Sequence, residues 1–190
     1  MQIIVTFRDA GLSAYAARLD ALAAGAGRAA IAQALNEGGE DVRHMTVSAE
    51  SAQTGLSTDT IDRAQRSIPA TSASLAFTIT SHGGNVRLKY FGAKEGGGGV
   101  TAHPWNRSTF YRGAFITSGR PGHRAPSPKL NGHVFENISG GRWHGKIRLK
   151  RSGLFIPTEM TKGKTAAAFD SGAATILATT VVSRLGAMLP

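Results

Sequence analysis

The 190-residue sequence predicts an α+β fold, in which N-terminal helices and one C-terminal helix pack on a mainly antiparallel sheet of about four to six strands with long Gly-rich loops. Three observations predict it. Apolar residues recur at three- and four-residue steps in the first third, alternate with polar residues in the middle, and return to helical spacing at the end. We expect one domain over residues 1–190, with 1–66 mainly helical, 73–157 forming the sheet and 163–189 forming the last helix.

Four segments of regular structure are expected before residue 66. β-Branched and apolar residues favour a strand in the first of them, and the apolar spacing favours packing helices with a solvated polar side in the others. Gly38 and Gly39 fall inside the longest helix, where each glycine costs about 1 kcal/mol relative to alanine. The segments are a strand at 3–7 and helices at about 12–23, 28–52 and 57–64, the last capped by Ser57 or Thr58.

The middle of the chain is expected to form the sheet. Residues 75–79 and 86–90 alternate apolar with polar or basic side chains around a glycine turn, which predicts a hairpin with one apolar and one basic face. Two glycine-containing connections, 92–107 and 119–128, are expected to be flexible loops. Further strands are expected at 110–117, 132–138 and 146–155.

A single apolar stripe predicts the C-terminal helix. Its members are Phe169, Ala173, Ile176, Leu177, Val181, Leu185 and Met188. No window approaches the roughly 18 uninterrupted apolar residues of a spanning helix, so we expect no membrane partner. The apolar run at residues 3–7 is too short for a signal peptide.

Positive charge is concentrated in residues 87–151, here called the basic segment. Thirteen of the 22 Lys and Arg residues lie there with only two acidic residues, Glu95 and Glu136, so the segment carries a formal charge of +11. A surface of one sign attracts polyanions, which makes nucleic acid a candidate partner.

Four basic residues are the candidate DNA-facing positions. Arg87 and Lys89 occupy alternate positions of one expected strand, and Arg148 and Lys150 occupy alternate positions of another. Contact to phosphates alone is expected, because no predicted helix has the charge of a recognition helix. The alternative, which the sequence leaves open, is that these residues form the solvated side of a half-buried sheet.

Residue patterns for catalysis or cofactor binding are scarce. The chain has no cysteine, which excludes disulfides and thiolate catalysis and fits assembly in a reducing cytoplasm. The glycines 96–99 are not followed by the Gly-Lys-Ser/Thr of a phosphate-binding loop, and no Gly-x-Ser-x-Gly elbow is present. The four histidines of the basic segment are too widely spaced for a metal pair. We therefore expect no enzyme, no cofactor and no metal site; a hydrolase is the least favoured function.

Five short motifs follow one another from residue 88 onward. They are LKYFGAK at 88–94, VTAHPW at 100–105, YRGAFI at 111–116, GHVF at 132–135 and IPTEM at 156–160. In this order they resemble the minor tail protein Z family of long-tailed bacteriophages and prophages. The resemblance runs from about Thr54 to the C-terminus. Residues 96–99 replace a more basic loop of the family and 119–128 looks like an enlarged one, so nothing is carried over to these two loops.

The resemblance implies a structural virion protein at the head-proximal end of the tail, the neck. Such proteins act in tail completion and head–tail joining, and they form rings, commonly sixfold, around the DNA channel. The implied partners are further copies of the chain, other tail and head-connector proteins, and the phage DNA backbone in the lumen. Arg87, Lys89, Arg148 and Lys150 would face that lumen, with nonspecific and salt-sensitive contacts. Assembly would take place in the host cytoplasm.

The glycine-rich connection at 92–107 would be a docking arm between subunits. Ala102, His103, Pro104 and Trp105 are its candidate contacts, since tryptophan favours interface centres. For Trp105 the alternative of a lid over the core stays equally open. The alternative function is a small nonspecific nucleic-acid-binding protein that acts as a monomer or dimer.

Overall fold

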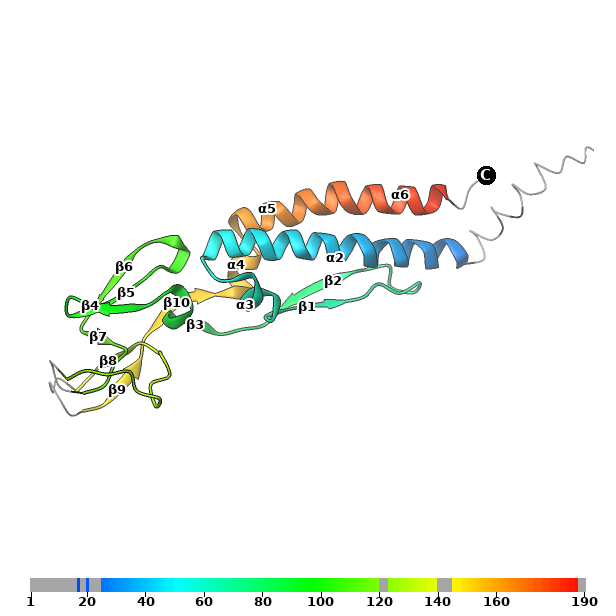
Figure 1. Ribbon diagram of the computed structural model, residues 1–190. Coiled ribbons are helices and arrows are strands. Elements are labelled where there is room, and N and C mark those ends of the chain that lie inside the picture. The colour runs from blue at the N-terminus through cyan, green and yellow to red at the C-terminus, as the bar shows by residue number, and fades with distance from the viewer. Residues whose placement is uncertain (1–16, 18–19, 21–24, 120–122, 140–144, 188–190) are drawn as a thin grey trace, which may run out of the picture. The chain divides into compact units, whose positions relative to one another are not determined.

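A computed structural model describes residues 17, 20, 25–119, 123–139 and 145–187 (Figure 1). Helices and several small antiparallel sheets make up these residues, which confirms the predicted α+β class. The strand expected at 3–7 and most of the helix expected at 12–23 lie outside the described residues. The chain divides into two compact units: a first unit of Met1–Met45, Ser67–Thr80 and Phe169–Pro190, and a second unit of Thr46–Arg66 and Ser81–Ala168.

The helices confirm the predictions at 28–52, 57–64 and the C-terminal segment. α2 runs without a break through Gly38 and Gly39. A short helix after the last strand was not predicted. The elements are α2 (Gly27–Thr54), α3 (Thr58–Asp62), α4 (Ile156–Met160), α5 (Gly163–Gly172), a π-helical stretch η4 (Ala173–Leu177), α6 (Ala178–Gly186), and the 3₁₀ turns η2 (Leu88–Phe91) and η3 (Pro104–Asn106).

The strands are distributed over small sheets, where one larger sheet was expected. β1 (Gln65–Ile68) pairs with β2 (Thr78–Ser81), and β3 (Asn85–Arg87) pairs with β10 (Arg151–Phe155). Two further sheets have three strands each. One contains β4 (Lys94–Gly96), β5 (Gly99–Ala102) and β6 (Thr109–Arg112), in that order. The other contains β7 (Ala114–Phe115), β8 (Phe135–Asn137) and β9 (Ile147–Leu149), also in order.

The hairpin expected between residues 75–79 and 86–90 is not formed, because β2 and β3 pair with different strands. After Arg87 the chain winds into η2, which buries Leu88 and Phe91. Gly92 ends that turn in the left-handed conformation, at φ +62°. Alternation of Leu88 with its polar neighbours indicated a strand, but burial of two side chains three residues apart is the spacing of a 3₁₀ turn.

The glycine-rich connection is a β-hairpin and not a flexible loop. Gly96 and Gly99 are register partners of β4 and β5, so Gly97 and Gly98 alone form the turn. Both have positive φ, +60° and +83°, which a two-residue hairpin turn of the primed type requires. The expectation that residues 92–107 are unpacked was therefore wrong: four consecutive glycines supply two turn residues and two strand ends.

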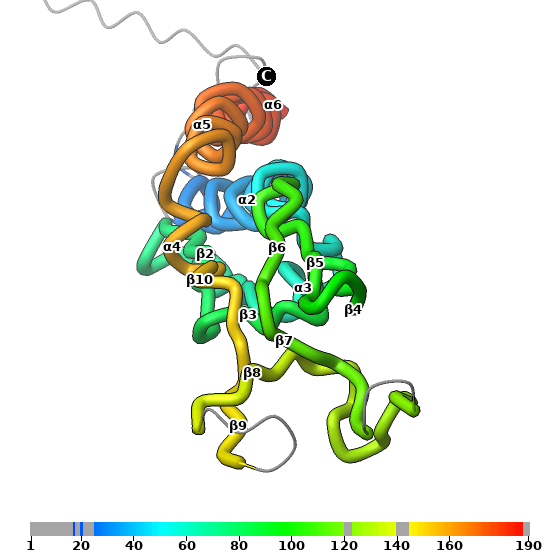
Figure 2. The backbone as a smooth tube through the Cα atoms, turned by 90° about the vertical axis from the view of Figure 1, so that its left-hand side faces the viewer, coloured from blue at the N-terminus to red at the C-terminus, as the bar shows by residue number. Residues whose placement is uncertain are grey.

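Small residues let the elements of the first unit approach closely. Figures 1 and 2 show α6 on one side of α2 and the segment leading into β2 on the other. A Cβ at Gly38 would lie 3.0 Å from Leu177 Cδ2, and one at Gly39 would lie 2.5 Å from Phe77 Cγ. The glycines that were expected to weaken α2 instead create the space in which its neighbours pack.

The core of the second unit consists of larger apolar side chains. It draws on the end of α2, on α3 and α4, on η2 and on strands of three sheets. Its buried residues are Val47, Leu56, Ile61, Val86, Leu88, Phe91, Val100, Ala102, Ala114, Val134, Leu154 and Ile156.

The C-terminal helix was expected to carry one apolar stripe. Ala173, Ile176, Leu177, Val181 and Leu185 are half-buried, in agreement with that expectation, and Phe169 is exposed. Within the described residues, Gly163–Gly186 is also long and apolar enough, by length and composition alone, to cross a membrane, with a mean hydropathy of 1.3 over its qualifying window. Because this helix contains polar residues between its apolar ones, it has no long uninterrupted apolar run, and the absence of a membrane partner stays an expectation.

Candidate functional site

The basic residues of the second unit fall into two classes, those paired with a carboxylate and those without one. Arg148 in β9 and Lys150 just after it share Glu136 of β8, with N–O distances of 2.6 and 2.7 Å. Hydrogen bonds from Lys150 and Arg148 hold the pKa of Glu136 below its ordinary value. Two of the four candidate DNA-facing residues are therefore partly neutralised by one acidic side chain.

The other two candidates, Arg87 and Lys89, lie outside the β7–β8–β9 sheet. Arg87 ends β3, and Lys89 belongs to η2, where its ammonium lies 5.3 Å from the centre of the Tyr90 ring. The prediction that Arg87 and Lys89 share a strand face was wrong, because the strand ends between them. The four residues do not form one continuous basic face of a sheet.

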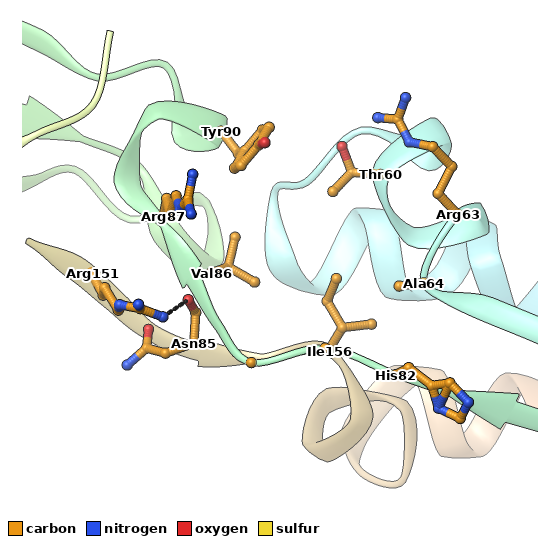
Figure 3. Close-up of a pocket in the computed structure, with 12 residues that line it drawn as sticks. Thr60, Arg63, Ala64, His82, Asn85, Val86, Arg87, Tyr90, Arg151 and Ile156 are labelled. Carbon is orange, nitrogen blue, oxygen red and sulfur yellow. Dashed lines mark hydrogen bonds between the residues drawn. The ribbon is translucent and has the colours of Figure 1, made fainter. Parts of the chain in front are cut away.

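A pocket of about 610 Å³ in the second unit contains arginines without a carboxylate partner (Figure 3). We call it the arginine pocket. Figure 3 shows Tyr90 and Thr60 facing each other across it, with Val86 below Tyr90 and Ile156 below Thr60. Its described lining contains no carboxylate: Thr60, Arg63, Ala64, His82, Gly83, Gly84, Asn85, Val86, Arg87, Tyr90, Arg151 and Ile156.

The three guanidinium groups of the arginine pocket have neutral partners or none. Arg151 donates to the backbone oxygen of Asn85 at 3.2 Å, and Arg87 Nη1 lies 3.1 Å from His133 Nε2. Within the described residues no ion pair involves Arg63, Arg87 or Arg151, and all three are exposed. Their charge is therefore directed at solvent or at a bound anion.

The pKa of His133 is affected by the positive charges beside the pocket. Burial lowers its pKa, and the charges of Lys89 and Arg87 lower it further. The neutral ring accepts the hydrogen bond from Arg87 at Nε2, so its proton lies on Nδ1, which is buried and has no partner among the described residues. An anion bound at Arg87 would weaken the repulsion and raise the pKa of His133.

Sequence reasoning missed Arg63, His82, Tyr90 and Arg151 as members of one site. Arg63 precedes the basic segment, and it follows α3. Arg151 begins β10, and the register of β10 against β3 places it opposite Arg87. The pairing of β3 with β10 brings Arg87 next to Arg151, 64 residues further along the chain. Neither the charge nor the alternation of the sequence predicts which strands pair.

The four candidate docking residues do not form an exposed arm. Ala102 and Pro104 are buried, and Trp105 is half-buried against the core of the second unit. Only His103 is exposed. Trp105 has positive φ, +53°, and its side chain hydrogen-bonds Glu159. The structure thus places Trp105 as a lid on the core, which was the open alternative.

A buried polar cluster joins the end of α2 to β1 and α4 within the second unit. Gln65 Nε2 donates to Glu50 Oε2 at 2.9 Å, but Oε1 of both side chains has no partner among the described residues. Burial, reinforced by the nearby charge of Glu159, raises the pKa of Glu50 to about 7. A protonated Glu50 gains a donor, for which Gln65 Oε1 is an acceptor.

Glu159 belongs to the same cluster but has the opposite ionisation preference. Burial raises its pKa, yet hydrogen bonds from Lys162, Gln53 and Trp105 outweigh burial and hold the pKa below its ordinary value. Gln53 Nε2 donates to Glu159 Oε2 at 2.9 Å, and Lys162 Nζ lies 2.9 Å from Oε1. With both carboxylates almost fully buried, we interpret the cluster as structural.

The described residues contain no group of three or more His, Asp or Glu side chains that could hold a metal ion. No protein-family model matches the chain, and no curated protein and no solved structure has a significant match to it.

Proposed function

We propose that the chain is a non-enzymatic structural virion protein at the head-proximal end of a bacteriophage tail. Copies of it would form a ring, sixfold in this proposal, around the DNA channel and act in tail completion and head–tail joining. Its partners would be further copies of itself, neighbouring tail and head-connector proteins, and the phage DNA.

The observation that supports this proposal is the convergence of the five motifs on one core. Each motif contributes at least one buried residue to the core of the second unit, although the motifs span residues 88–160. Their burial in one core makes the five motifs parts of one packed structure, because each buried position must satisfy packing. The contributed residues are Leu88, Phe91, Val100, Ala102, Ala114, Val134 and Ile156.

The geometry changes where DNA contact is proposed. Arg148 and Lys150 are shared with Glu136, whereas Arg87 lies with Arg63 and Arg151 in the arginine pocket. We therefore propose the arginine pocket, with Lys89 beside it, as the main contact to the DNA backbone. Such contact is independent of sequence and weakens steeply with salt.

Electron microscopy of purified virions tests the location. We expect a ring of density at the neck into which the second unit can be fitted, and mass spectrometry should find the chain in intact particles. Density confined to another part of the particle, or absence of the chain from virions, would refute the proposal. Particles from a deletion strain should contain filled heads and separate tails.

The docking role is now limited to exposed residues near η3. Deleting 96–105 would remove Val100 and Ala102 from the core and so could not separate docking from folding. His103→Glu changes an exposed side chain instead. We expect it to reduce head–tail joining while leaving the melting temperature of the isolated chain unchanged.

The second candidate function is a small nonspecific nucleic-acid-binding protein acting as a monomer or dimer. The unpaired arginines of the arginine pocket favour it, because they need no ring to bind phosphate. Light scattering of the free chain together with the virion assay distinguishes the two: a monomer or dimer that binds DNA and is absent from virions supports this second function.

A further inference from the structure

The arginine pocket combines three kinds of surface that rarely serve one simple anion. Arg63, Arg87 and Arg151 supply charge at its rim, and Tyr90, which is 46% exposed, lies beside them. Below them, Val86 and Ile156 form an apolar floor, both buried in the core. A free phosphate would use only the charged rim, so the floor and the ring indicate a ligand with a flat apolar part as well.

Size supports the same ligand class. About 610 Å³ lies within the range of roughly 300–1,000 Å³ that small-ligand pockets occupy. A nucleotide has a flat aromatic base and an anionic phosphate separated by a sugar. Its base can lie against Tyr90 and the floor while its phosphates meet the guanidinium groups, which bind phosphate oxygens in bidentate fashion.

Duplex DNA does not match this arrangement. Its bases are stacked inside the double helix, and the phosphates form the outer ridge, so a duplex could reach the rim of the pocket but not its floor. A single strand can turn one base out of the stack and insert it.

We propose that the arginine pocket binds one unstacked nucleotide of a single-stranded nucleic acid, with Tyr90 as the stacking surface and Arg63, Arg87 and Arg151 as the phosphate ligands. Thr60 and His82 also line the pocket and supply further hydrogen-bonding groups. The proposal goes beyond the proposed function, in which duplex DNA meets only the charged rim of the pocket. It is tested on the isolated chain, so its failure leaves the virion location open, and absence from virions leaves the pocket chemistry open.

The first test compares single-stranded and duplex ligands. Fluorescence anisotropy is measured with a labelled oligothymidine and with a duplex of equal length, over a series of salt concentrations. We expect the single strand to bind about tenfold more tightly than the duplex, within the range of roughly 5- to 150-fold that stacking of one base contributes. Equal affinity for the two would overturn the proposal and leave only a nonspecific charge interaction.

Matched charge variants locate the phosphate contacts. The pocket variant is Arg63→Gln, Arg87→Gln, Arg151→Gln. The control is Lys146→Gln, Arg148→Gln, Lys150→Gln, which removes the same charge from exposed or partly exposed positions around β9. We expect the pocket variant to lose at least about tenfold in affinity and to reduce the salt slope by about 2, from roughly 0.7 per phosphate contact. Equal losses in the two variants would refute a localised site.

A matched aromatic pair locates the base. Tyr90→Leu removes the stacking ring from the pocket, and Phe110→Leu removes an exposed aromatic from β6 outside it. We expect Tyr90→Leu to weaken single-strand binding about tenfold and duplex binding little, and Phe110→Leu to change neither. Unchanged single-strand affinity in Tyr90→Leu would contradict base insertion.

The pKa of His133 provides a readout that does not depend on affinity. Its NMR signal is assigned by comparison with His133→Gln and titrated with and without the oligothymidine. Phosphate at Arg87 should raise the pKa of His133, because it offsets one cause of the lowering. An unchanged pKa at saturation would overturn the placement of phosphate at Arg87. Binding of polyglutamate in place of the oligothymidine would show instead that the pocket takes an acidic protein segment.

Discussion

The two units reach stability by different kinds of packing. In the first unit, glycine and alanine at the helix surface let α2 lie close to α6 and to the segment around Phe77, and the buried apolar residues of its part of α2 are small: Ala32, Ala34 and Val42. In the second unit, Leu, Ile, Val and Phe side chains from many short elements meet in one core. Close backbone approach depends on the absence of side-chain atoms, whereas a core depends on their presence. Substitutions should therefore affect the two units in opposite ways.

The largest effect is expected from Leu88→Ala, which truncates a fully buried side chain in the second unit. Loss of a buried leucine side chain costs about 3 kcal/mol of unfolding free energy, through lost burial and a residual cavity. Val182→Ala in the first unit shortens an apolar residue that is 70% exposed, and it should change the free energy of unfolding by less than about 0.5 kcal/mol. Urea denaturation measures both. Similar losses of unfolding free energy in the two variants would contradict the proposed difference in packing between the units.

The buried polar cluster predicts a pH effect of nearly the same size in the second unit. Because the pKa of Glu50 is raised from 4.5 to about 7 in the folded chain, its protonated form is favoured on folding. Its contribution is fully present below pH 4.5 and is lost as the pH rises through 7.

Glu50→Gln should remove the loss of stability at high pH, because an amide stays neutral and can both donate a hydrogen bond to Gln65 and accept one from it. We expect the variant to be more stable than the parent by about 3 kcal/mol at pH 8 and nearly equal to it at pH 4. Glu136→Gln is the control of opposite sign, since the pKa of Glu136 is lowered. Denaturation curves at several pH values measure both variants. Parallel pH profiles of parent and Glu50→Gln would contradict a raised pKa.

Adding an atom should harm the first unit more than removing one. A Cβ at Gly39 meets the ring of Phe77, so Gly39→Ala forces a rearrangement that costs about 2 kcal/mol. Gly186→Ala, at the end of α6, meets nothing within 4 Å and should be neutral or stabilising by up to about 1 kcal/mol. Hydrogen exchange resolved by residue should show faster exchange in residues 25–45 of Gly39→Ala. Equal exchange rates in the two variants would contradict the idea that the first unit depends on close approach at glycine positions.

The smallest effect is expected at the surface ion pairs of the second unit. Glu136→Ala removes the carboxylate shared by Arg148 and Lys150, and such pairs contribute less than about 1 kcal/mol. The loss should shrink at high salt, because salt screens exposed charges. Melting temperatures at low and high salt check this. A loss that is independent of salt would indicate a packing role for Glu136.

Local patterns predicted most helices, and long-range pairing explains what they missed. The apolar spacing of residues 28–52 defined α2 to within a few residues, because helix periodicity is a property of one segment. The partners of β2 and β3 were predicted wrongly, because alternation tells which side of a strand is apolar but not which strand lies beside it. The β4–β5 hairpin was not predicted, although two glycines at a turn are a recognised hairpin pattern, because a run of four glycines is also typical of a flexible loop.

The candidate site could be predicted only in part for the same reason. Concentration of basic residues led to Arg87 and Lys89, but it could not separate them from Arg148 and Lys150, which have a carboxylate partner. That partner, Glu136, was visible as one of two acidic residues in the segment; its position opposite Arg148 depends on the register of β8 and β9.

The hydrogen bond between Trp105 and Glu159 gives this chain an optical property. Indole emission depends on the electric field across the ring, and the field at Trp105 includes the charge of Glu159 and of the neighbouring Glu50. With the second tryptophan, Trp143, replaced by phenylalanine, the emission wavelength of Trp105 would follow the ionisation of Glu50 near neutral pH. The emission of Trp105 is therefore an intrinsic fluorescence signal for the protonation of Glu50, the hydrogen-bond partner of Gln65.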